Sequence, residues 1–317
     1  MREAVFRRLN QERWRSYETP AAGQEPDALA ARFVALTDDL AYAQTFYPQS
    51  DTTAYLNQLA GRQHQSLYKN KAEERGRFGR FWAIEVPLVV SRHRAELRWA
   101  LAVFVLSMLI GALSAAYDDS FVRVVLGDDY VNQTLASIRR GDPMAVYKSQ
   151  PSDRMFLFIT LNNIRVSLLA FALGITGGVG TTFIMFRNGL MLGAFQFFFY
   201  RQHVLVASLL TVWIHGTLEI SSIVLAGGAG YVLARGVLFP GTFSRRESLK
   251  LAGRESLKLA LSTVPLLGIA GFLESFVTRH TEMPLAASLL IIGGSAAFIG
   301  WYYVVRPWQL RRALAAT

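Results

Sequence analysis

The chain has no cysteine among its 317 residues. Disulfides, thiol nucleophiles and cysteine-ligated zinc or iron–sulfur sites are therefore excluded. Charged residues are also scarce, at 18% of the chain against 52% hydrophobic residues. This balance is too apolar for an ordinary soluble domain and is typical of several membrane spans joined by water-exposed segments.

Two functional signals are also missing. The chain has no GxxxxGK phosphate loop, and its first thirty residues lack the apolar core of a cleavable signal peptide. We therefore expect the first span itself to direct membrane insertion. The net charge of +10 could indicate nucleic-acid binding. Basic flanks facing anionic lipid explain it more simply, so we expect a lipid bilayer and no nucleic acid as partner.

The ionisable residues are concentrated before the first long apolar run. Residues 1–76 predict three short amphipathic helices separated by prolines, which we interpret as a cytoplasmic helical module. Residues 77–98 predict an amphipathic lead-in kinked near Pro87, too short to cross about 30 Å of hydrocarbon. We expect this lead-in to lie on the membrane surface and to contact it through Arg77, Arg80, Phe81 and Trp82.

Residues 99–305 predict a membrane domain of about six spans. Basic residues flank both of its ends, so the positive-inside rule places both termini in the cytoplasm, and we expect the spans in the cytoplasmic (inner) membrane. The fold class is therefore all-α: a polytopic membrane helix bundle with an N-terminal helical module. The predicted spans are 99–117, 155–174, a third ending at 200, 204–234, 259–276 and 283–305.

Three water-exposed segments complete this topology: an outer loop at 118–154, a basic cytoplasmic loop at 235–258 and a cytoplasmic tail at 306–317. The inner turn between the second and third spans lacks basic residues, so broken or re-entrant helices are the alternative there. The basic loop contains the string RESLKLA twice, at 246–252 and 254–260. Two copies are too few for a solenoid and predict a lengthened basic surface helix.

Polar residues occur inside the predicted spans, where each is costly against lipid. His215 and Glu219 are four residues apart and share one helix face. Arg165 and Glu219 fall at similar depths, so we favour an ion pair between them, with the shallower Glu274 as the competing partner. The predicted intramembrane polar cluster comprises Asn162, Asn163, Arg165, Arg187, Asn188, His215, Glu219 and Glu274.

A catalytic or metal site is one interpretation of these residues. Zinc proteases carry HExxH on a helix, whereas this helix carries HGTLE and no span holds a second histidine. His215, Glu219 and Glu274 could still supply one imidazole and two carboxylates to a metal. A hydrogen-bonded contact between closely packed helices is the interpretation we favour. We therefore assign no catalytic residue, no metal ligand and no cofactor.

A resemblance to a known family is carried by the order of five strings: NNIRVSLLAFALGITGG, FRNGLMLG, WIHGTLEISSIVLAGGAGY, RESLKLAGR and FLESFVTR. Across roughly 161–278 the chain resembles the stage II sporulation protein M family of multispanning membrane proteins. The family member of spore formers belongs to a complex with cell-wall-degrading partners that drives engulfment. The long N-terminal region resembles that of the non-sporulation type, which tends to be encoded beside MoxR-type ATPases and von Willebrand A-like proteins.

The resemblance supplies no agreed catalytic role for any residue. We expect a non-enzymatic integral membrane scaffold or assembly component in bacterial envelope remodelling. The expected partners are a second copy in a homodimer and a MoxR-type ATPase or envelope proteins. Two alternatives remain open: a transporter or channel using Arg165, Glu219 and Glu274, and an intramembrane metal-dependent hydrolase centred on His215 and Glu219. Access of water to Glu219 distinguishes a working site from a packing contact.

Overall fold

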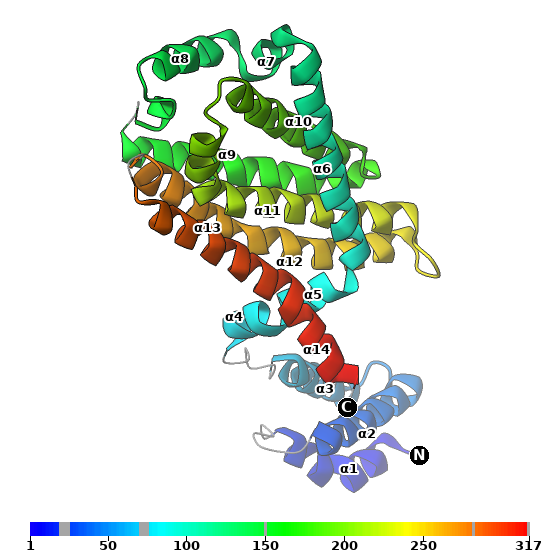
Figure 1. Ribbon diagram of the computed structural model, residues 1–317. Coiled ribbons are helices and arrows are strands. Elements are labelled where there is room, and N and C mark those ends of the chain that lie inside the picture. The colour runs from blue at the N-terminus through cyan, green and yellow to red at the C-terminus, as the bar shows by residue number, and fades with distance from the viewer. Residues whose placement is uncertain (19–25, 70–75, 149–150, 281–282, 316–317) are drawn as a thin grey trace. The chain divides into compact units, whose positions relative to one another are not determined.

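The computed structural model describes residues 1–18, 26–69, 76–148, 151–280 and 283–315, and every secondary-structure element within them is a helix (Figure 1). The predicted all-α fold class is confirmed. The chain divides into two compact units, Met1–Arg77 and Phe78–Thr317.

The first unit contains the three helices that the prolines delimit: α1 (Glu3–Glu18), α2 (Pro26–Phe46) and α3 (Asp51–Lys69). Their apolar stripes face one another and bury Trp14 to 2% exposure. The Trp14 indole Nε1 donates a hydrogen bond of 2.7 Å to the Asp39 carboxylate, so its buried polar group is satisfied. These thin stripes therefore form a core of their own. A cytoplasmic location for this unit stays a prediction.

The second unit is the helical bundle. Its first helices are α4 (Arg77–Arg80), the π-helix η1 (Phe81–Glu85), α5 (Val86–Arg92) and α6 (Arg94–Tyr117). They are followed by α7 (Asp119–Leu126), α8 (Asp128–Arg139), η2 (Ala145–Lys148), α9 (Ser152–Ala172), η3 (Leu173–Thr176), α10 (Val179–Arg201) and α11 (Leu205–Leu238). The last helices are α12 (Arg245–Phe272), η4 (Leu273–Val277), α13 (Leu285–Gly300), η5 (Trp301–Val305) and α14 (Arg306–Ala315).

Five helical runs are long and apolar enough to cross a membrane, which supports a membrane location for the protein. They are α6, α9 with η3, α11, α12 with η4, and α13 through α14. The predicted third span corresponds to α10, which is one continuous helix but is not among the five. Arg187, Asn188 and Gln196 lower its mean hydropathy.

The turn between α9 and α10 is tight. Gly177 and Gly178 adopt φ angles of +69° and +88°, a left-handed backbone that side chains with a Cβ rarely accept. Helix α9 extends through η3 to this turn, and α10 begins directly after it. In the described residues the second and third spans are therefore continuous helices joined by a glycine turn. A break or re-entrant loop is not observed there.

Glycines also bring α6 and α10 into backbone contact. A Cβ atom at Gly193 would collide with the carbonyl oxygen of Met108, and one at Gly111 would collide with that of Leu190. Gly174 and Gly230 make a similarly close approach between the end of α9 and α11. Small residues allow helices to approach closely where lipid supplies no hydrophobic drive between them. The glycine-rich strings of the sequence therefore serve helix packing.

The lead-in differs from the predicted surface helix. Val86, Val89 and Val90 of α5 are almost completely buried, and α5 packs against α12, η5 and α14. Pro87 lies in the first turn of α5, directly after the π-helix η1, and the predicted kink at this residue stays a prediction. Phe81 and Trp82 are partly buried against the same core, and Arg77 and Arg80 are exposed. Contact of those four residues with the membrane surface stays a prediction.

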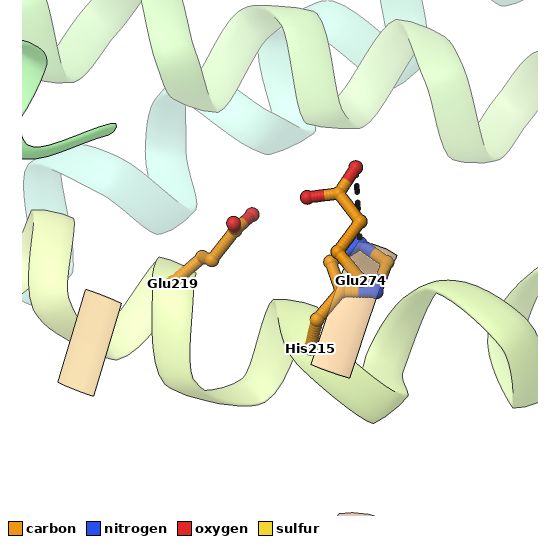
Figure 2. A group of neighbouring side chains, drawn as sticks. All are labelled: His215, Glu219 and Glu274. Atoms are coloured by element: carbon orange, nitrogen blue, oxygen red, sulfur yellow. Dashed lines mark ion pairs between the residues drawn. The ribbon is translucent and has the colours of Figure 1, made fainter. Parts of the chain in front are cut away.

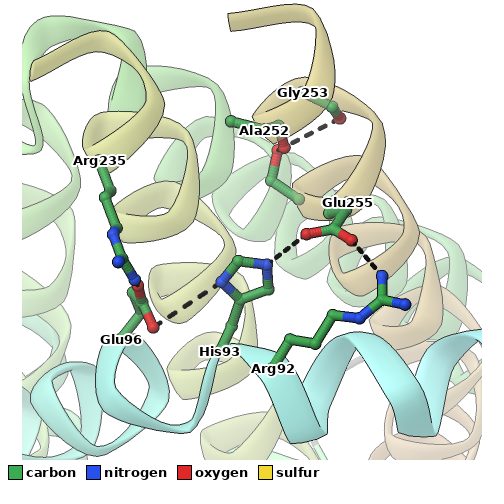
Figure 3. Close-up of polar contacts among 8 residues, drawn as sticks. Arg92, His93, Glu96, Arg235, Ala252, Gly253 and Glu255 are labelled. Atoms are coloured by element: carbon green, nitrogen blue, oxygen red, sulfur yellow. Dashed lines mark hydrogen bonds and ion pairs between the residues drawn. The ribbon is translucent and has the colours of Figure 1, made fainter. Parts of the chain in front are cut away.

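An ion-pair network holds the junction of α5 and α6 to α11 and α12 (Figure 3). Its centre is His93, whose Nε2 lies 2.6 Å from Glu255 Oε2, while its Nδ1 lies 3.8 Å from Glu96 Oε2. Arg92 donates to Glu255, and Arg235 donates to Glu96, each at 2.6 Å. The network ties four helices together at one end of the bundle.

The second copy of the RESLKLA repeat, residues 254–260, supplies the α12 side chains that form ion pairs with the lead-in. Glu255 binds Arg92 and His93, and Lys258 lies 2.6 Å from Glu85. In the first copy, Glu247 and Lys250 pair with each other at 3.7 Å and remain half exposed. An offset of eight residues turns a helix face by about 80° beyond two full turns, so the copies face different directions. The prediction of a plain surface helix is therefore wrong for the second copy.

The pKa of His93 predicts how this network responds to pH. Burial lowers that pKa, but the neighbouring carboxylates of Glu96 and Glu255 outweigh burial and raise it above the usual histidine value. The stabilisation is thus fully present below the unfolded-state pKa and is lost as pH rises through the higher folded-state pKa. We expect His93→Gln to lower the midpoint of thermal unfolding by roughly 2–4 °C at about pH 6 and by much less at pH 9. A difference that does not change with pH would contradict this assignment.

Candidate functional site

Four polar side chains from three helical elements converge inside the bundle. Asn163 comes from α9, His215 and Glu219 from α11, and Glu274 from η4. His215 and Glu219 project from one face of α11, and Glu274 approaches them from another helix, as Figure 2 shows. One ligand atom from each of these three residues lies within 4.8 Å of the others.

Specific contacts connect the four side chains. Asn163 Nδ2 donates a 2.5 Å hydrogen bond to Glu219 Oε1, and His215 Nε2 lies 4.0 Å from Glu274 Oε1. On the other side of the imidazole, Nδ1 lies 3.0 Å from Thr278 Oγ1. His215 is only 3% exposed. Its ring is therefore oriented by Thr278 on one nitrogen and directed toward Glu274 with the other.

The local backbone of η4 explains how Glu274 and Thr278 both reach His215. Residues Leu273–Val277 form a π-helix, and Thr278 N donates to Leu273 O at 2.8 Å in place of the usual four-residue bond. Such widened turns are rare and occur frequently at functional sites. Glu274 and Thr278 are four residues apart, so both side chains face the same side, toward α11.

The charge of the site is unbalanced. Among the described residues, no ion pair joins an arginine or lysine to Glu219 or Glu274; the two carboxylates contact each other, and Glu274 also lies 4.0 Å from His215. Two ionised carboxylates this close repel each other, and charge buried away from water is costly without a partner. The arrangement can therefore share a proton between the carboxylates or hold a cation. Those are the two chemistries that it supports.

A cavity of about 580 Å³ approaches the cluster from one side. Its wall includes Gly141 and Met144 after α8, Ile214 of α11, Thr278 and Ser288. Thr278 is thus shared, because it lines the cavity and also contacts His215. The volume is large enough for several water molecules. The cluster is therefore separated from this cavity by side chains of its own wall.

The structure separates the other predicted members from this site. Asn162, Arg165 and Arg187 are exposed on the surface of the bundle, and Asn188 Nδ2 donates to Ile184 O within its own helix. The hypothesis of an Arg165–Glu219 ion pair is wrong, because Asn163 is the side chain that reaches Glu219. Residues two apart on a helix point about 200° apart, so Asn163 and Arg165 cannot both face inward.

Sequence reasoning missed Thr278. A signal was present, since Thr278 follows Glu274 by four residues and therefore shares its helix face. The cavity had no comparable signal. Its wall combines residues from the segment after α8, the first half of α11 and the start of α13.

Comparisons with known proteins identify the family. The model of the family described as stage II sporulation protein M matches residues 100–279. A domain of unknown function (DUF8413) matches residues 4–69, which is consistent with the longer, non-sporulation type. No curated protein and no solved structure matches the chain. Because the first match covers more than half of the sequence and includes the whole His215–Glu219–Glu274 site, the chain belongs to the stage II sporulation protein M family.

Proposed function

We propose that the protein is a non-enzymatic membrane scaffold or assembly component in bacterial envelope remodelling, and that it binds a partner membrane helix along α9. The observation that carries this proposal is the exposed face of α9. It presents Asn162 and Arg165 away from the bundle, together with Phe158, Leu161 and Leu169. These residues follow helical spacing and form one continuous stripe.

The depth of Arg165 makes lipid a poor neighbour. Arg165 lies about 20 Å along the helix from Ser152 and about 17 Å from Thr176, at 1.5 Å per residue. An arginine in the middle of a span costs roughly 2.5–3.5 kcal/mol on insertion scales. A partner helix with a carboxylate or amide at the same depth would remove most of that cost.

Helix α13 provides the comparison within the same molecule. The spans of α9 and α13 are equally peripheral, each with 11% of its most apolar window buried. Residues Leu285–Gly300 of α13 contain no charged side chain, so lipid alone can cover them. Helix α9 is just as uncovered, but it carries an arginine. This difference favours a protein partner for α9 and lipid for α13.

The chemistry of the partner follows from the charges. Arg165 is the cationic residue of the exposed α9 stripe, so a partner helix on that stripe faces a positive charge. The carboxylates Glu219 and Glu274 of this chain face the bundle interior. A second copy would therefore bring arginine against arginine. A different envelope protein with an acidic or amide group in its span fits better than a homodimer.

The outward position of Arg165 also argues against the transporter alternative. A pathway formed by Arg165, Glu219 and Glu274 requires the three side chains to share one interior. Arg165 faces outward, whereas the two carboxylates lie in the cluster with His215. These positions favour the scaffold over that three-residue pathway.

The absence of cysteine permits a direct test by crosslinking in native membranes. A single cysteine at Leu161, beside Arg165, should yield a crosslinked product with a second protein. A cysteine at Leu290 on α13, which is 76% exposed, should not. Adding Arg165→Leu should lower the yield about tenfold, equivalent to about 1.4 kcal/mol. Arg154→Leu, in the first turn of α9, is the matched control and should leave the yield unchanged.

Three results would contradict the proposal. Equal crosslinking from Leu161→Cys and Leu290→Cys would show that the α9 face is not selective. A product of twice the chain mass would identify a second copy as the occupant instead. An unchanged yield with Arg165→Leu would remove the arginine from the interface.

A further inference from the structure

We propose that His215, Glu219 and Glu274 bind one divalent transition-metal ion, either Zn²⁺ or Mn²⁺. This proposal goes beyond the scaffold function and does not rest on it. The three side chains come from two helical elements, yet their ligand atoms lie within 4.8 Å of one another inside the bundle. Negative charge on the two carboxylates needs a positive partner inside the bundle. One imidazole with two carboxylates is a donor set suited to a metal ion.

The geometry is close to that of a bound ion. Ligand atoms at about 2.1 Å from a tetrahedral metal are separated by about 3.4 Å. The observed separation between His215 Nε2 and Glu274 Oε1 is 4.0 Å, and no separation among the three ligand atoms exceeds 4.8 Å. Small rotations of the two glutamate side chains would close that gap. No movement of the helices is required.

The donor set limits the choice of ion. One imidazole with two carboxylates suits Zn²⁺ or Mn²⁺, whereas Ca²⁺ and Mg²⁺ prefer oxygen ligands alone. Two negative carboxylates would also neutralise a dication completely. This matters because no arginine or lysine of the described chain pairs with either glutamate. The ion would supply the positive charge that the surrounding side chains do not.

Two further residues hold the ligands in position. Thr278 Oγ1 lies 3.0 Å from His215 Nδ1, which leaves Nε2 directed at Glu274. Asn163 donates to Glu219 and orients that carboxylate. Outer contacts of this type set the tautomer of a ligating histidine and strengthen binding. Thr278 and Asn163 are therefore assigned as positioning residues.

The cavity lies next to the cluster, and three protein ligands leave part of the coordination of an ion unfilled. Thr278 lines the 580 Å³ cavity and also contacts His215, so one side chain lies between the cavity and the cluster. Three protein ligands leave at least one coordination position open, as in catalytic zinc sites. That position would take water.

The test is metal binding by the full-length protein, purified in detergent with a tag that contains no histidine. Protein stripped with a chelator is titrated with Zn²⁺ or Mn²⁺, and the bound metal is counted. We expect one ion per chain and a higher midpoint of thermal unfolding on addition of the ion. His215→Gln and Glu274→Gln should each weaken binding at least 100-fold, and Thr278→Val about 10- to 100-fold. Glu247→Gln, on the half-exposed start of α12, is the control and should bind normally.

The wild-type protein alone keeps the proposal testable if a variant does not fold. X-ray absorption at the zinc edge should show one imidazole nitrogen and otherwise oxygen ligands. Failure to bind one ion, binding that survives both His215→Gln and Glu274→Gln, or a spectrum with two or more imidazoles would overturn the proposal.

Discussion

Gly193→Val is expected to destabilise the bundle by about 3 kcal/mol or more, the largest effect of a single substitution in this account. Helices α6 and α10 touch through their backbones here, and a Cβ at Gly193 would collide with the Met108 carbonyl oxygen and approach Ala112 N. A flexible side chain could move aside, but a backbone within a helix cannot. The helices must therefore separate and lose packing along their length.

Gly293→Val supplies the control for this prediction. Gly293 lies in the apolar helix α13, and no atom lies within 4 Å of the position that its Cβ would occupy. The intrinsic helix propensities change equally in the two variants, so the comparison isolates the collision. We expect the midpoint of thermal unfolding to fall by roughly 8 °C or more for Gly193→Val and by little for Gly293→Val. Equal midpoints would show that α6 and α10 are not in close contact.

Asn163→Leu should be the second most damaging change, at about 1–3 kcal/mol. The substitution removes the donor to Glu219 Oε1 and leaves a partly buried carboxylate oxygen without that hydrogen bond. Thermal unfolding of purified protein measures the loss. The expected shift is a lowering of the midpoint by roughly 2–10 °C.

The neighbouring residue provides a matched control. Asn162 has the same side chain and lies on the same turn of α9, but it is exposed on the bundle surface. Asn162→Leu should therefore leave the midpoint unchanged in detergent. If Asn162→Leu and Asn163→Leu lower stability equally, the inward orientation of Asn163 is incorrect.

The helices of this fold could be predicted because their signals are local. Prolines delimit the three helices of the first unit, and long apolar runs mark α6, α11 and α13. The close approach of α6 and α10 could also be anticipated from the glycines of α10. These features depend on neighbours in the sequence, which propensity and periodicity describe well.

The composition of the site could be predicted only in part. The four-residue spacing alone places His215 and Glu219 on one helix face. The residue of another helix that contacts Glu219, however, depends on how that helix is rotated about its axis as well as on the depth of the residue along the span. Depth along the spans favoured Arg165, whereas the rotation of α9 directs Asn163 inward. Glu274 lies near the end of its span, yet it reaches the cluster because α11 extends beyond that end. The spacing of Glu274 and Thr278 places both on one helix face, but no local sequence signal indicated the π-turn of η4 between them.

The contacts of the second RESLKLA copy could not be predicted either, because they depend on which face of α12 meets a neighbouring helix. The two RESLKLA strings predicted a lengthened basic surface helix. Their offset of eight residues places the second copy on a different face, where Glu255 meets His93. The sequence of a helix defines its faces, but only the packed structure shows which face meets a neighbour.

The central claim is that Glu219 belongs to an inward-facing cluster with Asn163 and is not the partner of Arg165. A pair of double-mutant cycles on thermal stability tests it most directly. The cycle of Asn163→Leu with Glu219→Leu should give a coupling energy of about 0.6–1.7 kcal/mol, the range measured for hydrogen bonds between membrane helices. The cycle of Arg165→Leu with Glu219→Leu should give a coupling within about 0.5 kcal/mol of zero. Strong coupling in the second cycle and none in the first would contradict the account.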